Sequence, residues 1–374
     1  MKILFAGGGT GGHFYPIIAV ARQLRRIAEE ERFFAFEFIF ASDNPIDKAL
    51  LEFEEIRYKE IPTGKIRNYA SGRNVSDMLK TFFAVIRAFF FMYNEMPDVV
   101  FGKGGYASFP VLLAARLLGI PVIIHESDAV PGKVSNWAKK FARRIAISFP
   151  EVAEYFPKDR TALIGNPIRT QLLGGNRDES RVVYGLEDKT PTILVIGGSQ
   201  GARSINNMLL GALPQILERA QVIHQCGDAN FEDVIKQASV ILQNSPKKSR
   251  YHIFPFLDED RLRSAAIGSD IVISRAGGTA IFEIAAWGLP SIIIPLPLAA
   301  QNHQRANAYS YARSGACEVI EETNLTPYVL FTEISKLLDN QARVTEMKKA
   351  AQGFARLDAA EKLAREIIKL GLHE

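Results

Sequence analysis

The chain has 374 residues, of which 47% are hydrophobic and 23% charged, a composition typical of a folded globular protein rather than a disordered one. This length predicts two domains, or at most three. The net charge of +4 suits anionic ligands or an anionic membrane surface, whereas no basic tail or recognition motif indicates nucleic acid. Cys226 and Cys317 are too few for a disulfide framework or a cysteine metal site, so we expect buried thiols in a reducing compartment.

The apolar runs of the chain are short. Residues 3–6 form a run too short for the core of a signal peptide, so we expect no export. The longest run, from Thr81 to Tyr93, is interrupted by Arg87. It falls short of the roughly 18 to 20 apolar residues that a membrane-spanning helix needs, so we expect no such helix.

A short apolar run followed by a glycine cluster occurs twice, about half a chain length apart. Residues 3–13 read ILFAGGGTGGH, and residues 193–203 read ILVIGGSQGAR. After the first cluster, apolar residues recur at helical spacing from Ile17 to Ile27. Each pattern therefore predicts the strand, glycine loop and helix start of a nucleotide-binding α/β unit.

A second pair of similar segments follows in the same order. Residues 98–124 and 270–294 each run through an acidic residue, an apolar strand, a basic residue, a glycine turn, a helix and another apolar strand. Lys103 and Arg275 occupy corresponding places. Two matching pairs in matching order predict a doubled Rossmann-like α/β architecture, in which ligands bind beyond the carboxyl ends of parallel strands.

The predicted domain boundary lies where glycine and proline interrupt the pattern, within residues 162–176. We predict an N-terminal domain over residues 1–162 and a C-terminal domain over residues 163–357. The last residues, 358–374, read as a charged amphipathic helix, and we expect this helix to pack back on the N-terminal domain.

The first glycine cluster also fits a dinucleotide pattern. Gly7, Gly9 and Gly12 satisfy G-x-G-x-x-G, and Asp43 follows a second strand-like run, so an NAD-dependent dehydrogenase is formally possible. That interpretation leaves the second glycine cluster unexplained. The repeat favours one phosphate-bearing ligand held between two similar domains, with backbone N–H groups as anion donors.

One acidic motif resembles a metal-binding pattern. Asp258, Glu259 and Asp260 match D-x-D, but they directly precede a helical run where acidic residues cap the N-terminus. No cluster with metal-ligand spacing occurs elsewhere. We therefore predict no metal site.

Seven motifs, in order, resemble the MurG family of peptidoglycan glycosyltransferases. They are GGGTGGH, FGKGGYAS, HESDAVPGKVSN, GNPIR, GGSQGAR, the Arg-Ala-Gly-Gly stretch with Glu283 downstream, and HQRANA, and they run from Lys2 to about Ala308. The resemblance implies a GT-B fold, in which two Rossmann-like domains face each other across a cleft. It implies UDP-N-acetylglucosamine as donor, lipid I (undecaprenyl-diphosphoryl-muramoyl-pentapeptide) as acceptor, lipid II as product, an inverting β-1,4 transfer, and no cofactor.

The resemblance assigns most of the donor contacts to the C-terminal half. Glu283 would accept the ribose hydroxyls, and Arg169 would contact the donor diphosphate. The other implied donor-binding residues are Thr10, Gly11, Gly12, Ser199, Gln200, Phe256, Leu257, Arg275, Gly277, Thr279, His303 and Gln304.

The acceptor side and the general base lie in the N-terminal half. His13 would orient the acceptor diphosphate or take the proton of the acceptor hydroxyl, and Glu126, Asp128 and His125 compete for the second role. The family commonly has His-Glu-Gln-Asn where this chain has His-Glu-Ser-Asp, and Lys103 and Phe109 also depart from its pattern. The implied acceptor-binding residues are Gly104, Gly105, Tyr106, Ser108 and His125.

An apolar segment near basic residues predicts docking on an anionic membrane. The candidate docking residues are Phe82, Phe83, Ile86, Phe89, Phe90, Lys139 and Lys140. We expect a peripheral enzyme on the cytoplasmic face of the bacterial inner membrane, near other proteins of cell-wall synthesis. Two alternatives stay open: a UDP-sugar epimerase of the same fold, and a non-catalytic UDP-sugar-binding scaffold.

Overall fold

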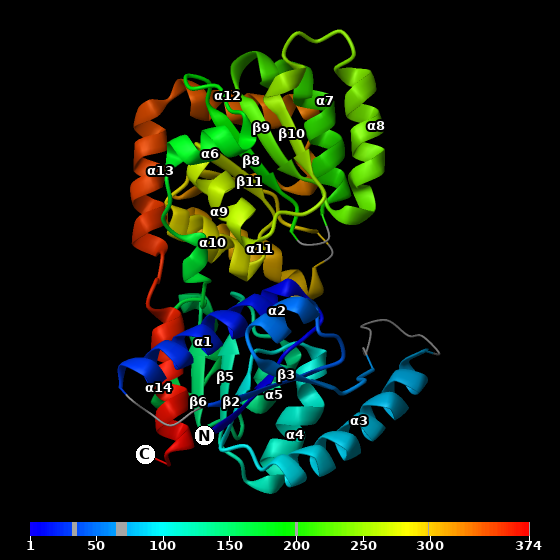
Figure 1. The fold of residues 1–374 in the computed structure, drawn as a ribbon, viewed down its shortest axis with the longest axis vertical. Helices are drawn as coiled ribbons and strands as arrows, with labels where there is room; N and C mark the ends of the chain where they lie inside the picture. The colour runs from blue at the N-terminus through cyan, green and yellow to red at the C-terminus, as the bar shows by residue number, and fades with distance from the viewer. Residues whose placement is uncertain (32–35, 65–72, 199–200, 298, 374) are drawn as a thin grey trace. The chain divides into compact units, whose positions relative to one another are not determined.

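The computed structural model divides the chain into two compact units (Figure 1). The N-terminal unit comprises Met1–Arg169 and Arg356–Glu374, and the C-terminal unit comprises Thr170–Ala355. The structure describes residues 1–31, 36–64, 73–198, 201–297 and 299–373. The predicted boundary between residues 162 and 163 falls inside a short strand that pairs within the N-terminal sheet, and the division comes after Arg169.

The N-terminal unit is built on a seven-stranded sheet in the order β3-β2-β1-β4-β5-β6-β7, with all neighbours parallel. Its strands are β1 (Lys2–Ala6), β2 (Glu37–Ser42), β3 (Ile56–Glu60), β4 (Val99–Gly102), β5 (Val122–Glu126), β6 (Arg144–Ile147) and β7 (Thr161–Leu163). The central strands are continuous apolar runs because helices cover both faces of a parallel sheet.

Two hydrophobic cores lie on the two faces of this sheet. One combines the apolar side of α1 (Gly11–Glu30) with α14 (Ala359–Gly371), and the other combines α3 (Arg73–Glu95) with α4 (Phe109–Leu118). The unit also contains the short helices α2 (Lys48–Phe53) and α5 (Lys133–Ala138). In the part of the chain that the structure describes, every helix is too short or too polar to cross a membrane.

The last helix, α14, belongs to the N-terminal unit although it follows the whole C-terminal unit in the chain (Figure 1). Leu363 and Ile367 are buried in the same core as Ile3 and Phe5 of β1. Charged pairs flank this apolar contact, among them Arg365 with Glu31 at the end of α1. The apolar side of this amphipathic helix therefore packs against one face of the first sheet and completes its core.

The C-terminal unit repeats the design with a six-stranded parallel sheet in the order β10-β9-β8-β11-β12-β13. Its strands are β8 (Thr192–Ile196), β9 (Gln221–Gln225), β10 (Tyr251–Phe254), β11 (Ile271–Ser274), β12 (Ser291–Ile293) and β13 (Cys317–Val319). Its helices are α6 (Arg177–Tyr184), α7 (Arg203–Arg219), α8 (Phe231–Ile241), α9 (Glu259–Gly268), α10 (Gly278–Trp287), α11 (His303–Arg313), α12 (Pro327–Asp339) and α13 (Gln341–Phe354).

The two sheets share one topology. In each, the first strand of the unit lies in the middle, the next two strands lie to one side and the later strands to the other. The strand order reverses beside β1 and beside β8, and a ligand crevice opens at the carboxyl ends of parallel strands at such a point. The sequence prediction of a doubled Rossmann-like fold is confirmed, since both glycine clusters follow these central strands.

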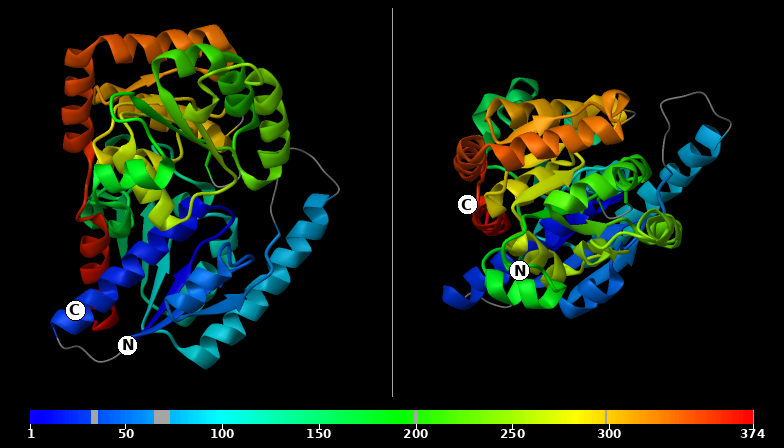
Figure 2. Two further views of the ribbon diagram at one scale, coloured as in Figure 1. Left: turned by 45° about the horizontal axis from the view of Figure 1, so that its top comes forward. Right: turned by 90° about the horizontal axis from the view of Figure 1, so that it is seen from above.

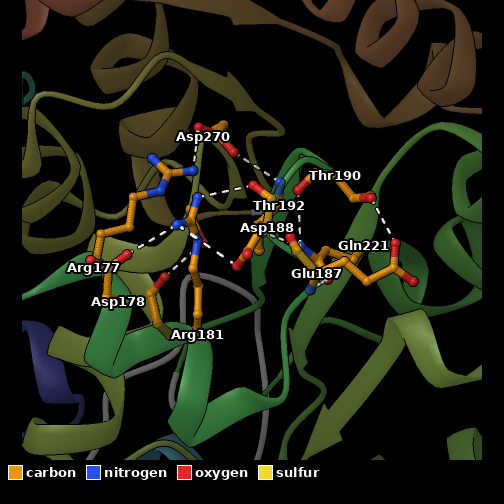
Figure 3. Close-up of polar contacts among 11 residues, drawn as sticks. Arg177, Asp178, Arg181, Glu187, Asp188, Thr190, Thr192, Gln221 and Asp270 are labelled. Carbon is orange, nitrogen blue, oxygen red and sulfur yellow. Dashed lines mark hydrogen bonds and ion pairs between the residues drawn. The ribbon is translucent and has the colours of Figure 1, made fainter.

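The opposite, amino edge of the second sheet is closed by a polar cluster (Figure 3). The buried Gln221 amide donates to the carbonyls of Glu187 and Thr190 and accepts from the Glu187 N–H. Asp270 accepts from the Thr192 N–H and pairs with Arg177 at 2.7 Å. These bonds fix the starts of β8, β9 and β11, so the polar residues at this edge have a structural role.

The packing of α14 generates a stability prediction. We expect Ile367→Ala to lower the free energy of unfolding of the N-terminal unit by about 2–5 kcal/mol, because a fully buried isoleucine leaves a cavity. Guanidinium unfolding measures the loss, and hydrogen exchange assigns it to the N-terminal unit. Leu372→Ala, at a half-exposed position just past α14, is the control and should change stability by less than about 0.5 kcal/mol. Equal effects of both variants would contradict this packing.

Candidate active site

The first glycine loop runs from the end of β1 to the start of α1, and its backbone is too crowded for larger residues. A Cβ at Gly8 would lie 2.4 Å from the Ser42 hydroxyl oxygen. Gly9 has φ +89°, a conformation that glycine adopts without strain. Thr10, Gly11 and Gly12 form the start of α1, and the N-terminus of a helix favours an anion.

His13 lies in the first turn of α1 and is half-buried. Its Nδ1 atom lies 3.1 Å from the Thr10 hydroxyl. Its ring also faces the glycine turn after β4, since a Cβ at Gly104 would lie 3.9 Å from Nε2. The tertiary structure thus brings the ends of β1 and β4 together around one imidazole.

The turn after β4 depends on two glycines with positive φ, Gly104 and Gly105. A Cβ at Gly105 would lie 2.7 Å from the Gly8 carbonyl oxygen, so the two loops meet backbone to backbone. Ser108 donates its hydroxyl to the Gly105 carbonyl at 2.8 Å. Tyr106 donates to Asp43 at the end of β2. Two of the candidate acceptor residues therefore also hold the turn in place.

A buried ionic cluster lies behind this turn. Lys103 is 1% exposed and donates to the Ser127 hydroxyl at 2.7 Å. Burial lowers the pKa of Lys103, while the negative charges of Glu126 and Asp128 oppose that shift. Burial, together with Asp128, raises the pKa of Glu126. Residues at the ends of β4 and β5 are therefore electrostatically linked.

The segment after β5 is held by Glu126. Its carboxylate accepts from the N–H of Gly132 at 2.9 Å and from the N–H of Asp128 at 3.2 Å. Asp128 itself is half-buried. This arrangement gives Glu126 a structural role in the loop and leaves Asp128 closer to solvent.

His125 is completely buried at the end of β5. Its Nε2 donates to the Gly165 carbonyl at 2.9 Å and lies 3.2 Å from the Ser148 hydroxyl. Burial lowers its pKa well below the usual value, and the positive charge of Lys103 adds to the effect. His125 is therefore neutral and fixes the segment that leads to Arg169.

Arg169 is the last residue of the N-terminal unit. Its guanidinium lies 4.0 Å from the centre of the Tyr15 ring in α1, and the side chain is 6% exposed. Stacking on an aromatic ring holds the guanidinium plane in one orientation. It thus places a positive charge beside the helix that carries His13.

In the C-terminal unit, the second glycine loop is as crowded as the first. A Cβ at Gly197 would lie 2.4 Å from the Ala202 N atom, and one at Gly201 would lie 2.0 Å from the Cys226 carbonyl oxygen. Gly198 and Gly201 both have positive φ. Ser199 and Gln200, two candidate donor contacts, lie outside the described residues.

Arg275 is bound within its own unit. It pairs with Glu322, donates to the Ser204 hydroxyl at 2.8 Å and donates to the Ile294 carbonyl at 3.2 Å. Ser204 lies in the first turn of α7, directly after the glycine loop. These bonds make Arg275 a support for the loop.

The start of α10 carries three candidate residues. Gly277 precedes the helix with open space at its Cβ position, and Thr279 and Glu283 are 7% and 8% exposed within it. Asn307 of α11 donates to the Ala276 carbonyl at 3.1 Å and so fixes the turn before α10. A carboxylate in an apolar helix, at the carboxyl edge of a parallel sheet, suits a hydroxyl-bearing ligand.

His303 and Gln304 open α11 and are both half-buried. The Gln304 Oε1 accepts from the Leu296 N–H at 3.0 Å. With its oxygen held, the Gln304 amide presents its two N–H groups as donors. The helix is preceded by Gln301 and Asn302, both with φ +55°.

Phe256 and Leu257 follow β10. Phe256 is 37% exposed, whereas Leu257 is 2% exposed and donates its N–H to the Gln225 side chain at 3.0 Å. Asp258 caps α9 through the Arg261 N–H, and Asp260 pairs with Arg263. Among the described residues, His, Cys, Asp and Glu side chains form no group of three that could hold a metal ion.

One cavity of the C-terminal unit lies away from these residues. Its volume is about 250 Å³, and its lining includes Arg177, Asp270, Leu337 and Lys348 at the amino edge of the second sheet. Its lining contains no residue that we predict to bind the donor or the acceptor.

Comparison with known proteins identifies the family. Residues 3–147 match the glycosyltransferase family 28 N-terminal domain, and residues 192–363 match the family's C-terminal domain. A UDP-N-acetylglucosamine--N-acetylmuramyl-(pentapeptide) pyrophosphoryl-undecaprenol N-acetylglucosamine transferase of Thermodesulfovibrio yellowstonii is 36% identical over 97% of both chains. The enzyme of the same name from Clostridium kluyveri is 34% identical over 94% of this chain and 95% of its own. The chain belongs to the MurG family.

Solved structures agree with this assignment. MurG of Acinetobacter baumannii is 29% identical, with a TM-score of 0.73 over 98% of this chain and 99% of that one. A UDP-GlcNAc 2-epimerase from Neisseria meningitidis has a TM-score of 0.69 over 99% of this chain and 100% of its own, but only 14% identity, so it shares the fold alone. This MurG-family chain is a glycosyltransferase of the GT-B fold.

Several residues that support the site of this MurG-family chain were absent from the sequence prediction. Gln225, Asn206 and Glu322 hold the second glycine loop or its surroundings. The sequence carried only a weak signal for Gln225. His224 and Gln225 are polar residues at the carboxyl end of a strand, and ligands bind beyond the carboxyl ends of parallel strands. The partners of Glu322 and Asn206 come from distant segments and left no local pattern.

Buried histidines generate a pH prediction for this chain. Burial lowers the pKa of His224 to about 3 and that of His125 well below its usual value, so both imidazoles should stay neutral at pH 5. Their ¹⁵N chemical shifts measure this directly, with His125→Gln and His224→Gln assigning the signals and a histidine peptide as the titrating control.

The same shifts link stability to pH. Below about pH 6.5 the unfolded chain binds protons at these histidines and the folded chain does not, so the free energy of unfolding should fall as pH falls. Imidazolium shifts at pH 5 in the folded protein would contradict the buried, neutral assignment.

Proposed function

We propose that this chain transfers N-acetylglucosamine from UDP-N-acetylglucosamine to the C4 hydroxyl of the muramoyl sugar of lipid I, giving lipid II. The observation that carries the proposal is near-full-length identity of 34–36% to transferases named for this reaction. Two glycine loops at the ends of central parallel strands support it, because each can hold a phosphate-bearing ligand.

The donor is assigned mainly to the C-terminal unit. In this proposal the buried Glu283 carboxylate accepts hydrogen bonds from the ribose hydroxyls, and the Phe256–Leu257 segment contacts uracil. Backbone N–H groups around Gly197 and Gly198 face the diphosphate, where negative charge develops as UDP leaves. His303 and the side-chain N–H groups of Gln304 face the sugar, and Thr279 and Gly277 shape the start of α10.

The acceptor is assigned to the N-terminal unit. The Gly104–Ser108 turn borders His13. Thr10, Gly11 and Gly12 at the start of α1 stay assigned to the donor, as does Arg169, whose positive charge is held by Tyr15. Because Arg275 is bound to Glu322 and Ser204, we assign it the support of the donor loop rather than contact with the donor.

Transfer with inversion needs one displacement at the anomeric carbon. The acceptor oxygen forms the new bond as the bond to the UDP oxygen breaks, and the acceptor proton passes to a base. His125 is buried with its Nε2 engaged, and Glu126 is held by backbone N–H groups. His13 and Asp128, both half-buried, are therefore the two groups we assign to receive the proton.

The proposal predicts acceptor-dependent release of UDP. Wild-type protein, UDP-N-acetylglucosamine and a lipid I analogue, assayed in EDTA, should release UDP and form the disaccharide. Without the analogue, release should be negligible, because displacement needs the acceptor hydroxyl. Acceptor-independent chemistry would support an epimerase or hydrolase, and UDP binding without release would support a scaffold.

Variants connect this assay to the residues. Glu283→Gln should raise the KM for UDP-N-acetylglucosamine by about tenfold or more with a smaller change in kcat, since ribose binding is lost. His13→Ala should mainly lower kcat. Glu232→Gln, an exposed carboxylate of α8, is the matched control and should match the wild type. If both test variants had the kinetics of the wild type, the roles assigned to Glu283 and His13 would be wrong.

We also propose that α3 docks the protein on an anionic membrane at the cytoplasmic face of the bacterial inner membrane. The helix, light blue in Figure 2, belongs to the N-terminal unit. It buries Ala84, Ala88 and Met92 against its unit and leaves large apolar side chains exposed to solvent. The exposed members are Met78, Leu79, Phe82, Phe83, Ile86, Phe90 and Tyr93. Their spacing places these side chains along one side of the helix, and an exposed apolar surface of this kind is typical of an interaction site.

Two candidates for this surface have other partners. Phe89 packs partly against the core, and Lys139 donates to the Tyr155 carbonyl at 2.7 Å. Lys140 is exposed and remains a candidate for lipid headgroups. The apolar stripe on α3 therefore provides most of the proposed contact.

Vesicle binding tests the membrane proposal. We expect Phe82→Ser with Phe83→Ser to reduce binding to vesicles of phosphatidylglycerol and phosphatidylcholine about tenfold or more, because two exposed rings no longer enter the interface. Sedimentation measures binding, and activity on a water-soluble acceptor should be unchanged. Phe53→Ser, at an exposed phenylalanine of α2, is the control. Equal vesicle binding by all three proteins would refute docking through α3.

A further inference from the structure

Gln225 connects two loops of the C-terminal unit. It is the last residue of β9 and is 3% exposed. Its Nε2 donates to the Gly198 carbonyl at 3.1 Å, and its Oε1 accepts from the Leu257 N–H at 3.0 Å. One side chain thus bonds the glycine loop after β8 and the segment after β10.

The sheet order explains why this position can make both bonds. β9 lies between β10 and β8, and Gln225 is in register with Phe254 on one side and with Ile196 on the other. Both loops leave the sheet just beyond these partners. A residue at the end of the middle strand is therefore the shortest connection between its neighbours' loops.

The backbone around Gln225 is itself fixed. The next residue, Cys226, donates its N–H to the Phe254 carbonyl at 3.0 Å, and its own carbonyl accepts from Asn206 at 2.9 Å and Asn230 at 3.0 Å. Gly201 passes so close to the same carbonyl that no side chain would fit there. The backbone that carries the Gln225 side chain is consequently held in one position.

The chemistry of the two bonds requires a primary amide. One end must donate to a carbonyl and the other must accept from an N–H, and a buried amide satisfies both. A glutamate has the same shape, but it would place a carboxylate oxygen where Gln225 has its N–H donor. Two acceptor oxygens would then face each other at the Gly198 carbonyl, and the hydrogen bond would be lost. A methionine of similar length would leave both backbone groups without this partner, at the cost of unmade buried hydrogen bonds.

We propose that Gln225 is a positioning residue for the nucleotide, which sets the spacing between the loop that holds the diphosphate and the segment that contacts the base. The inference rests on the proposed donor site. A ligand that spans both loops, such as UDP, depends on that spacing. A ligand that occupies the base segment alone, such as uridine, does not.

Ligand binding to the full chain tests the inference. For Gln225→Glu and Gln225→Met, we expect the Kd of UDP to rise about tenfold or more, measured by calorimetry, while the Kd of uridine, measured by NMR, changes less than about threefold. With UDP-N-acetylglucosamine, the KM should rise more than kcat falls.

A matched control lies on the same strand. Gln221 is also buried, also bonds several backbone groups, and lies at the opposite end of β9 (Figure 3). Gln221→Met should lower thermal stability but leave the Kd of UDP within about twofold of the wild type. This comparison separates loss of fold from loss of nucleotide positioning.

Three results would overturn the inference. An unchanged Kd of UDP in both Gln225 variants would show that the link has no role in binding. Equal losses for UDP and uridine would place the effect in the base segment alone and leave the donor site intact. Failure of the wild type to bind UDP would instead refute the proposed donor site itself.

Discussion

Backbone packed directly against backbone at the glycine loops is the constraint on which the rest of the structure depends. Gly105 meets the Gly8 carbonyl in the first unit, and Gly201 meets the Cys226 carbonyl in the second. No side chain fits between these segments, so loops from neighbouring strands share one edge of each sheet. The same closeness leaves main-chain N–H groups at helix starts to face a ligand, as anion binding requires.

Around these loops the two units use different chemistry. The N-terminal unit gathers ionisable groups, with Lys103, Glu126, Asp128 and two histidines electrostatically linked behind the first loop. The C-terminal unit holds its loop with amides and one ion pair, through Gln225, Asn206 and Arg275. Proton transfer suits the first environment, and fixed recognition of a nucleotide suits the second.

The fold by itself does not select the reaction. A UDP-GlcNAc 2-epimerase at 14% identity has nearly the same TM-score as MurG of Acinetobacter baumannii at 29%. This fold is thus compatible with more than one chemistry. What separates this chain from the epimerases is its near-full-length identity of 34–36% to transferases of the MurG family.

Much of the architecture could be predicted because its signals are local. An apolar run, a glycine cluster and a helical repeat follow each other within about 30 residues, which is why the doubled Rossmann-like fold was readable. The candidate site residues came with the motifs for the same reason. The glycines and prolines of residues 162–176 indicated the region that contains the division after Arg169, but the exact position had no signal, because β7 is a three-residue strand with little pattern.

The sequence by itself determined the two repeated units, the glycine loops and the family. Only the tertiary structure decided that Arg275 pairs with Glu322 and that Gln225 joins two loops. It also decided that Phe82 and Phe83 face solvent, whereas an apolar helix alone would be expected to bury them. Each of these outcomes depends on partners distant in the chain, and hydrogen bonds and burial between distant segments leave no periodic signal in the sequence.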